Sequence, residues 1–263
     1  MNTLASRTIA ALRTEHDDLT ALVTTFTADQ LDAQSGAEEW TVAQVLSHLG
    51  SGSEISLATL RAGLGEGTAP GNDFNQATWD RWNAMSPADQ RTGFIEHDAA
   101  LVEALEALTP EQHDSLQVTL GFLPAPLSVA SVAGLRLNEV AQHSWDVRVS
   151  VYPTAGLLAV SSEVLPEHLS GALAFMLGFW GKADRIPNDV VLVIEGSGYA
   201  LTITDTVSLA ELPAADATAT FDGPMEAALR LVTGRLRAAY TPSDVTVTGN
   251  VTLDELRAAF PGF

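Results

Sequence analysis

The feature that most constrains the fold is a change in the spacing of apolar residues along the chain. In the first half, apolar side chains recur at roughly every third or fourth residue, which is typical of amphipathic helices. From about residue 190 they occur in short runs bounded by Gly, Asp and Thr, which is typical of strands. A chain of 263 residues with two such textures most naturally forms two domains.

The N-terminal half predicts a four-helix bundle. Helices are expected over about 3–26, from Thr41 to about 60, from about 72 to 108 with a break at Ser86-Pro87, and over about 128–150. Thr41 and Gln44 have the spacing of a capping box, and proline is tolerated in the first turn of a helix. Residues 114–127 contain two prolines and are expected to be irregular.

The C-terminal half predicts a small α+β domain. Tyr152-Pro153 and Gly156 mark the boundary, so the expected domains are 1–155 and 156–263. After a linker helix over about 161–182, strands are expected over 190–196, 199–206, 217–223 and 244–250, with helices over about 224–237 and from Thr252. Thr252 and Glu255 again have capping-box spacing.

Composition limits both partners and chemistry. The net charge is −20, from 33 acidic and 13 basic residues, so phosphate backbones and anionic membrane surfaces are repelled. No signal peptide and no long apolar run are visible, and we expect a cytoplasmic protein. Because the chain has no cysteine, any metal ion must be bound by His, Asp or Glu side chains.

Three residues of the predicted bundle have the character of metal ligands. Glu139 and His143 are four residues apart, so they lie on one face of their helix. His48 lies among apolar residues of the second helix and is expected to face inward as well. A divalent ion would neutralise an otherwise costly buried carboxylate. The alternatives are a hydrogen-bonded Glu–His pair or a solvated helix face, and Asp146 is a candidate for supporting a ligand.

Other candidate residues are expected to have structural roles. His16 and His97 have acidic neighbours in the sequence and are expected on solvated helix faces. Trp40 and Trp145 are expected to be packing residues. The sequence contains no nucleophile elbow, phosphate-binding loop or dinucleotide-binding fingerprint.

Two segments resemble a known family. EEWTVAQVLSHLG resembles the second-helix signature of the DinB-like superfamily, and LRLNEVAQHSWDVRV resembles its fourth-helix signature, with Glu and His in place of the common His pair. The glutamate variant, followed by an α+β domain, is similar to the mycothiol-dependent maleylpyruvate isomerase family. The implied architecture is multi-domain: an all-α DinB-like four-helix bundle followed by a small α+β sterol-carrier-like domain.

The resemblance also implies a site and a co-substrate. It implies Zn²⁺ held by the residues that match His48, Glu139 and His143, although another divalent metal is possible. It implies mycothiol, the low-molecular-weight thiol of actinobacteria, as co-substrate. The LVTGRL segment matches a family run that makes Arg235 a candidate catalytic residue for binding a substrate carboxylate. Arg81 is the candidate for a second arginine from the N-terminal domain.

The leading hypothesis is therefore a zinc- and mycothiol-dependent enzyme acting on a small electrophilic substrate. Both S-transfer and cis–trans isomerisation are compatible with it, and S-transfer is slightly favoured because the sequence does not fix the position of the isomerase's N-terminal arginine. The alternatives are a non-catalytic small-molecule-binding module, with a structural metal or none, and a metal-dependent hydrolase. A monomer or a homodimer is expected, with neither nucleic acid nor membrane as a partner.

Overall fold

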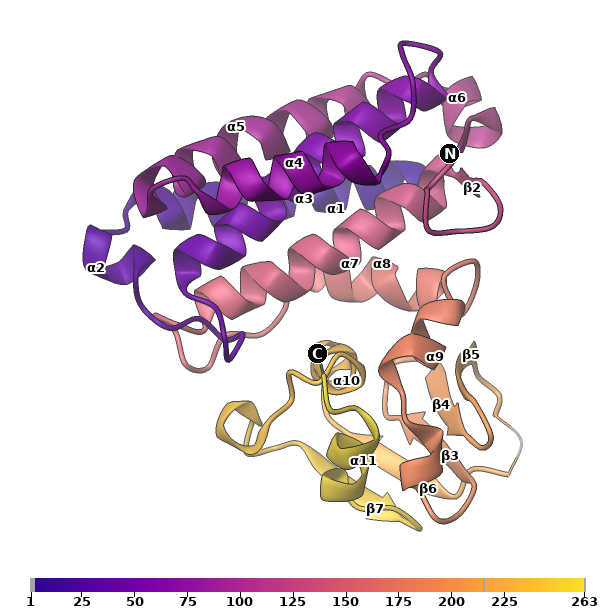
Figure 1. The fold of residues 1–263 in the computed structure, drawn as a ribbon. Coiled ribbons are helices and arrows are strands. Elements are labelled where there is room, and N and C mark those ends of the chain that lie inside the picture. The colour runs from indigo at the N-terminus through magenta and orange to yellow at the C-terminus, as the bar shows by residue number, and fades with distance from the viewer. Residues whose placement is uncertain (1–2, 215, 263) are drawn as a thin grey trace. The chain divides into compact units, whose positions relative to one another are not determined.

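The computed structural model describes residues 3–214 and 216–262. The chain forms two compact units, Met1–Pro153 and Thr154–Phe263 (Figure 1). The N-terminal unit is helical and the C-terminal unit is α+β, so the expected fold class is confirmed. Among the described residues, no helix has both the length and the apolarity needed to span a bilayer.

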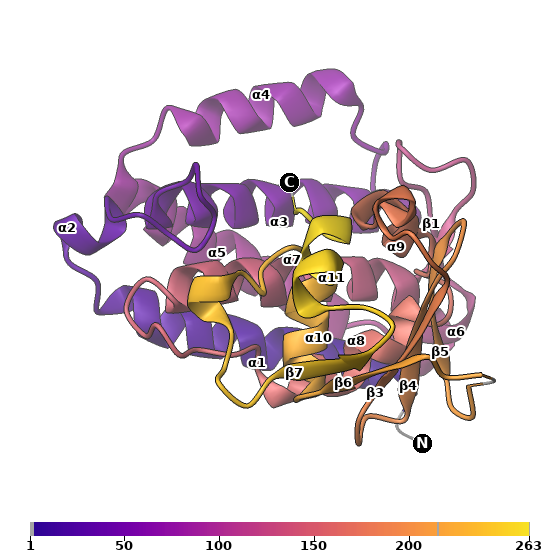
Figure 2. The ribbon, with the colours of Figure 1, turned by 90° about the horizontal axis from the view of Figure 1, so that it is seen from below.

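Four long helices build the N-terminal unit. Helices α1, α3, α5 and α7 pack against one another (Figures 1 and 2), and smaller elements complete the unit. The helices are α1 (Leu4–Thr24), α2 (Ala28–Leu31), α3 (Val42–Gly63), α4 (Asn72–Asn83), α5 (Pro87–Glu106), α6 (Pro110–Ser115) and α7 (Val129–Arg148). Strands β1 (Gln117–Val118) and β2 (Leu127–Ser128) form a short antiparallel ladder.

The predicted helix starts of the bundle are confirmed by their caps. The Thr41 hydroxyl accepts a hydrogen bond from the Gln44 backbone, and the Gln44 side chain accepts one from the Thr41 backbone. Ser86 caps α5, with Pro87 in its first turn. The expectation that 114–127 is wholly irregular was wrong. Helix α6 begins at Pro110 and extends into that segment. After the helix, strand β1 pairs with strand β2 across the remaining loop.

One large side chain of helix α4 is buried in the bundle. Trp82 is fully buried, and its ring lies over Gly50 of α3 and Gly93 of α5. The Trp82 indole N–H donates to Glu54 at 3.0 Å, and the Gln90 side chain donates to the Trp82 carbonyl. The two glycines thus leave the space that this indole fills.

We expect Gly50→Ala to destabilise the N-terminal unit. A Cβ atom at this position would lie 2.2 Å from the Trp82 ring, and a fully buried indole has little room to move. Overpacking of this kind costs about 1–3 kcal/mol, which exceeds the helix propensity gained by replacing glycine with alanine. Urea unfolding checks this result. Gly178→Ala is the matched control, because nothing lies within 4 Å of its Cβ position.

The C-terminal unit is a five-stranded sheet with helices. Its strands are β3 (Val190–Ile194), β4 (Tyr199–Ile203), β5 (Val207–Glu211), β6 (Ala219–Asp222) and β7 (Thr246–Gly249), in the order β5-β4-β3-β6-β7. The β3–β6 pair is parallel and the other pairs are antiparallel. The helices are α8 (Ala159–Leu169), α9 (Phe175–Trp180), α10 (Met225–Val232) and α11 (Leu253–Ala259).

Several predicted boundaries in this unit were wrong. The segment 161–182 is two helices, because the chain turns between Leu169 and Phe175. Helix α10 ends at Val232, since Gly234 adopts a φ of +75° where its backbone approaches Gly262. Strand β5 was missed in the sequence. The capping box at Thr252 is confirmed.

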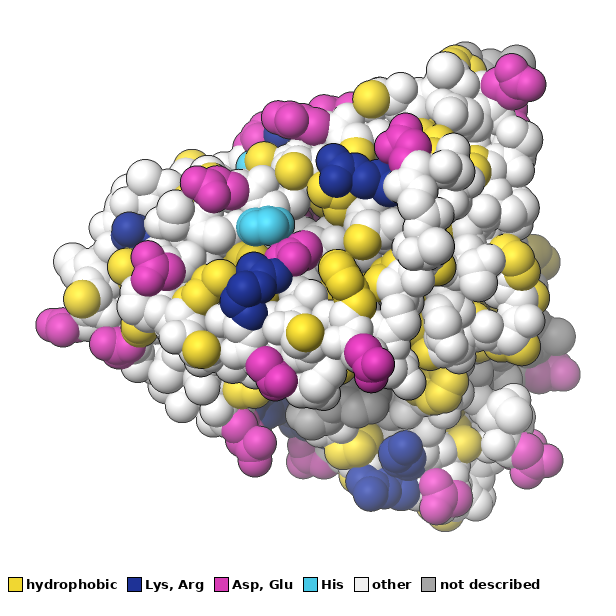
Figure 3. All heavy atoms as spheres, turned by 45° about the horizontal axis from the view of Figure 1, so that its top comes forward, with side chains coloured by type: hydrophobic (Ala, Val, Ile, Leu, Met, Phe, Trp, Pro, Cys, Tyr) yellow, Lys and Arg dark blue, Asp and Glu magenta, His cyan; other side chains and the backbone are white. Residues whose placement is uncertain are grey.

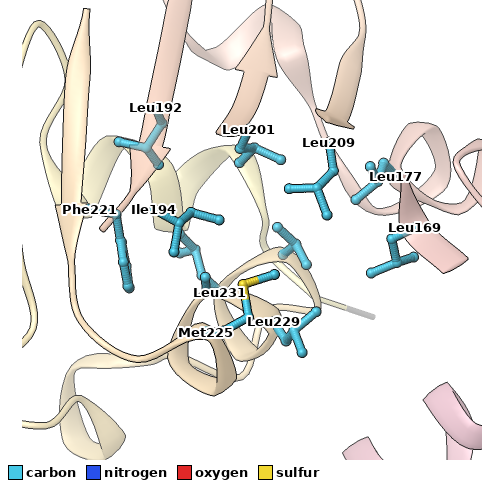
Figure 4. A pocket seen from close by; sticks show the side chains of 12 residues that line it. Leu169, Leu177, Leu192, Ile194, Leu201, Leu209, Phe221, Met225, Leu229 and Leu231 are labelled. Atoms are coloured by element: carbon cyan, nitrogen blue, oxygen red, sulfur yellow. The ribbon is translucent and has the colours of Figure 1, made fainter. Parts of the chain in front are cut away.

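The core of the C-terminal unit is filled by its own side chains. Leucines, Ile194 and Phe221 of the sheet face Met225 and other apolar residues of α8, α9 and α10 (Figure 4). The cavity left among them is about 10 Å³, which is room for about one water molecule. The unit as described therefore has no space there for a lipid-sized ligand, which weakens the alternative of an apolar-ligand-binding module.

Candidate metal centre

The structure brings the three predicted ligand residues together. His48 projects from α3, whereas Glu139 and His143 project from α7. One donor atom from each lies within 4.8 Å of the others. The Nε2 atom of His48 is 3.2 Å from Glu139 Oε2, and the Nε2 atom of His143 is 3.7 Å from the same oxygen.

This donor set fits a tetrahedral divalent ion. Zinc–nitrogen and zinc–oxygen bonds of about 2.0–2.2 Å place neighbouring donors of a tetrahedron about 3.3 Å apart. The observed separations of 3.2 and 3.7 Å are close to that value. Two imidazoles and one carboxylate are a ligand combination that zinc uses in catalytic sites, where the fourth position stays open.

The Glu139 carboxylate is held in its ionised form. Desolvation would raise its pKa, but the hydrogen bond with His48 and the nearby imidazole of His143 outweigh that effect and lower the pKa to about 2. The side chain is 45% exposed, so solvent moderates these interactions. At neutral pH Glu139 is therefore a carboxylate, the form that binds a metal.

Asp146 orients His143 from the side opposite Glu139. Its Oδ2 atom is 2.9 Å from the Nδ1 atom of His143, and the Asp146 side chain is buried. A proton on Nδ1 satisfies this contact and leaves the lone pair of Nε2 for a metal. The backbone N–H of Gly36 donates to the Asp146 carbonyl at 2.7 Å, so the loop before α3 is fixed against α7 at this residue.

Trp40 lies against both histidines. Its ring centroid is 5.0 Å from that of His48 and 5.7 Å from that of His143. Trp40 was expected to be a packing residue, and it packs on the donor cluster itself. The loop that carries it is close to α7 because Gly36 has no Cβ, which would lie 2.9 Å from the Asp146 Cα atom. Trp145 is fully buried, as expected of a core residue.

We expect Asp146→Asn to lower zinc affinity by about 10- to 100-fold, the usual cost of losing a residue that orients a histidine ligand. The amide oxygen accepts a weaker hydrogen bond from the Nδ1–H group than the carboxylate does. His143 is therefore a weaker and less well oriented metal ligand. Competition against a chromophoric chelator measures the affinity. Asp114→Asn, at an exposed position on α6, is the control and should bind zinc like the parent protein.

A buried polar cluster lies deeper in the same bundle, and the sequence analysis missed it. Asp98 of α5 lies 2.8 Å from His16 Nδ1 and 2.8 Å from the Arg136 guanidinium. It also accepts a hydrogen bond from Ser53. His16 is 5% exposed, so its expected place on a solvated face was wrong. The signal was the position of Asp98 between Phe94 and Leu101 on the apolar face of its helix.

Arg136 connects this cluster to the donor residues. It donates to the carbonyl of Leu49, which follows His48 on α3, and it precedes Glu139 by one turn of α7.

The prediction for His97 was also inaccurate. Its ring is half-buried, packs on Trp82 and lies 3.8 Å from Glu54.

The two candidate arginines lie in different units and have contacts of their own. Arg81 of α4 contacts Glu54 at 2.5 Å and is half-exposed. Arg235 belongs to the C-terminal unit and follows the turn after α10, where it contacts the Thr233 carbonyl at 3.4 Å. The catalytic roles of Arg81 and Arg235 stay predictions.

A cavity of about 640 Å³ borders the donor cluster at His48. It is formed within the N-terminal unit by α3, the loop before it, α4 and the start of α5. Its lining residues are Asp32, Trp40, Thr41, Ala43, Gln44, His48, Ser51, Trp79, Asn83, Met85, Pro87 and Gln90. A small molecule held in this cavity would lie beside His48.

Fold and site together define a class of protein: a helical bundle that presents a His/Glu/His donor cluster, followed by an α+β unit. A sequence profile of the mycothiol maleylpyruvate isomerase N-terminal domain matches residues 12–148. That match covers more than half of the 263 residues. The chain belongs to this family.

Two curated relatives match part of the chain. Two uncharacterized proteins from two strains of Mycobacterium tuberculosis are 31% identical to the chain over 145 residues, which is 53% of this chain and 54% of each relative. The chain thus matches about half the length of these curated relatives.

Solved structures extend the similarity to the whole fold. The crystal structure of a mycothiol-dependent maleylpyruvate isomerase superposes with a TM-score of 0.63, and that of its histidine-to-alanine mutant with 0.62. Each match covers 95% of this chain and 98% of the solved chain at 18% identity. At this identity the likeness establishes the fold.

Proposed function

We propose that the chain is a zinc-dependent enzyme that uses mycothiol to attack a small electrophile. His48, Glu139 and His143 would hold the ion. The observation that carries the proposal is the convergence of their donor atoms, with Asp146 behind His143. Family membership supports mycothiol as the thiol. When bound, a divalent metal lowers the pKa of a thiol and so supplies a nucleophile at neutral pH.

The chain's own residues would contribute position and charge. Glu139 brings a negative charge that balances the cation, and Asp146 holds His143 in the tautomer that binds metal. Trp40 covers one side of the two imidazoles and limits the access of water from that side. The cavity beside His48 provides a place for a co-substrate next to the donor cluster.

S-transfer is the outcome that we favour over isomerisation. In S-transfer the thiol sulfur forms a bond to an electrophilic carbon and the adduct is released. The thiol proton either ends on the neighbouring carbon of a former double bond or leaves with the group that the sulfur displaces. In isomerisation the sulfur adds to the carbon–carbon double bond, the adduct rotates about the resulting single bond, and the C–S bond then breaks to restore the double bond and the thiol. A dicarboxylate substrate of this reaction must be bound by cations. Arg81, the candidate cation of the N-terminal unit, is already paired with Glu54.

The test supplies the purified protein with zinc, mycothiol and either maleylpyruvate or a bimane electrophile. We expect a thioether product from the bimane and little turnover of maleylpyruvate. Metal analysis before and after chelation establishes whether activity follows zinc content. Absence of product with every electrophile, together with no zinc retained, would contradict the proposal.

A further inference from the structure

We infer that the cavity beside His48 selects an uncharged electrophile with an aromatic or apolar body and discriminates against carboxylates. This inference rests on the proposed function, since it assigns the substrate class of the same site. It is carried by the charges and the chemistry of the cavity lining, which are properties of the N-terminal unit alone.

One part of the cavity wall is apolar. The indoles of Trp40 and Trp79 line it, together with Met85 and Pro87. Trp79 of α4 is 43% exposed, so a large aromatic surface is available to a ligand. Flat aromatic faces and a polarizable thioether favour apolar and aromatic groups.

Most of the polar lining groups are neutral, and several already bind the backbone. The Gln44 side chain accepts from the Thr41 N–H, the Gln90 side chain donates to the Trp82 carbonyl, and the Ser51 hydroxyl donates to the His48 carbonyl. Such groups hold the shape of the cavity more than they offer strong new hydrogen bonds. A ligand with a few neutral polar atoms suits this lining.

The charge of the lining is negative. Asp32 is the charged side chain among the described lining residues, which include neither Lys nor Arg. A carboxylate ligand would lose hydration beside these side chains and would meet the like charge of Asp32, whereas the charge of a bound divalent ion would be balanced by Glu139 and the thiolate. The net charge of −20 disfavours the approach of anions further. Acidic side chains are also more conspicuous than basic ones on the face shown in Figure 3.

Two electrophiles with the same reactive group test the inference. N-ethylmaleimide is uncharged, whereas 3-maleimidopropionate carries a carboxylate. With either one, the mycothiol sulfur bonds to one alkene carbon and the thiol proton ends on the other, so nothing leaves. After subtraction of the uncatalysed rate, we expect kcat/KM to be at least tenfold higher for N-ethylmaleimide, mainly through KM.

Charge variants sharpen the comparison. Asn83 is exposed and lines the cavity near the end of α4, where a cation also suits the helix dipole. Asn83→Arg should raise kcat/KM for 3-maleimidopropionate severalfold relative to that for N-ethylmaleimide. Thr92→Arg adds the same charge at an exposed position outside the cavity lining, and it should change neither value.

The opposite preference would overturn the inference. A parent enzyme that uses 3-maleimidopropionate as well as or better than N-ethylmaleimide contradicts it. If that preference disappears in Arg235→Ala, recognition of the carboxylate belongs to the C-terminal unit.

Binding separates this inference from the proposed function. If neither maleimide is turned over, the proposed function fails, but the cavity can still be tested with chemically prepared thioethers of mycothiol and each maleimide. Quenching of tryptophan fluorescence reports their binding, because Trp40 and Trp79 line the cavity. Tighter binding of the uncharged thioether supports the inference, and equal or weaker binding contradicts it.

Discussion

In His143→Ala, zinc affinity is expected to fall by more than a hundredfold, and thiol-transfer activity is expected to fall with it. The variant removes one of three protein donors, whereas loss of a residue that merely orients a donor costs about 10- to 100-fold. It also leaves Asp146 buried without its imidazole partner. Isothermal titration with zinc, followed by metal analysis after gel filtration, measures the loss.

The control for this variant is another histidine of the same unit. His113 is on α6 and is not one of the three clustered donors, so the zinc affinity of His113→Ala should equal that of the parent protein. Far-ultraviolet circular dichroism of both variants separates loss of a ligand from loss of the fold. Full zinc binding by folded His143→Ala would exclude the proposed ligand set.

The donor cluster was accessible to sequence analysis because its parts obey local rules. Glu139 and His143 are one helical turn apart, which fixes their common face whatever the rest of the fold does. His48 follows a capped helix start, so the helix face on which it lies could also be predicted from the sequence. The distance between α3 and α7 could not be predicted from the sequence, because it depends on packing between helices that are far apart in the chain.

The sequence did not indicate contacts between residues that are distant from each other in the chain. Asp98, His16 and Arg136 come from three helices. His16 and Arg136 each alone resemble a surface residue, and the place of Asp98 on an apolar helix face does not identify its partners. Trp40 illustrates the same limit, because its role as a wall of the site follows from a loop that Gly36 allows to approach α7. In the C-terminal unit, the helix end at Val232 depends on the approach of Gly234 to Gly262, which no local pattern encodes.

The buried cluster around Asp98 carries the largest expected effect on stability. Burial would raise the pKa of Asp98, but hydrogen bonding to His16 and the charge and hydrogen bonds of Arg136 outweigh it and lower the pKa. Asp98→Ala removes the carboxylate and leaves the Arg136 guanidinium buried without its counter-ion. Breaking a buried ion pair in this way costs about 3–5 kcal/mol, so the variant should unfold at much lower urea concentration.

Two further comparisons distinguish the loss of charge pairing from a simple cavity. The double variant Asp98→Leu, Arg136→Met replaces the pair by apolar groups and should recover a large part of the lost stability; recovery of none would contradict this account. Acid gives the second comparison. Because the pKa of Asp98 is lowered in the folded protein, its contribution is present above the unfolded-state value and is lost as pH falls through the folded-state pKa. The parent protein should therefore lose stability on acidification more steeply than Asp98→Ala, and parallel curves from pH 7 to acid would show that Asp98 is not the group responsible.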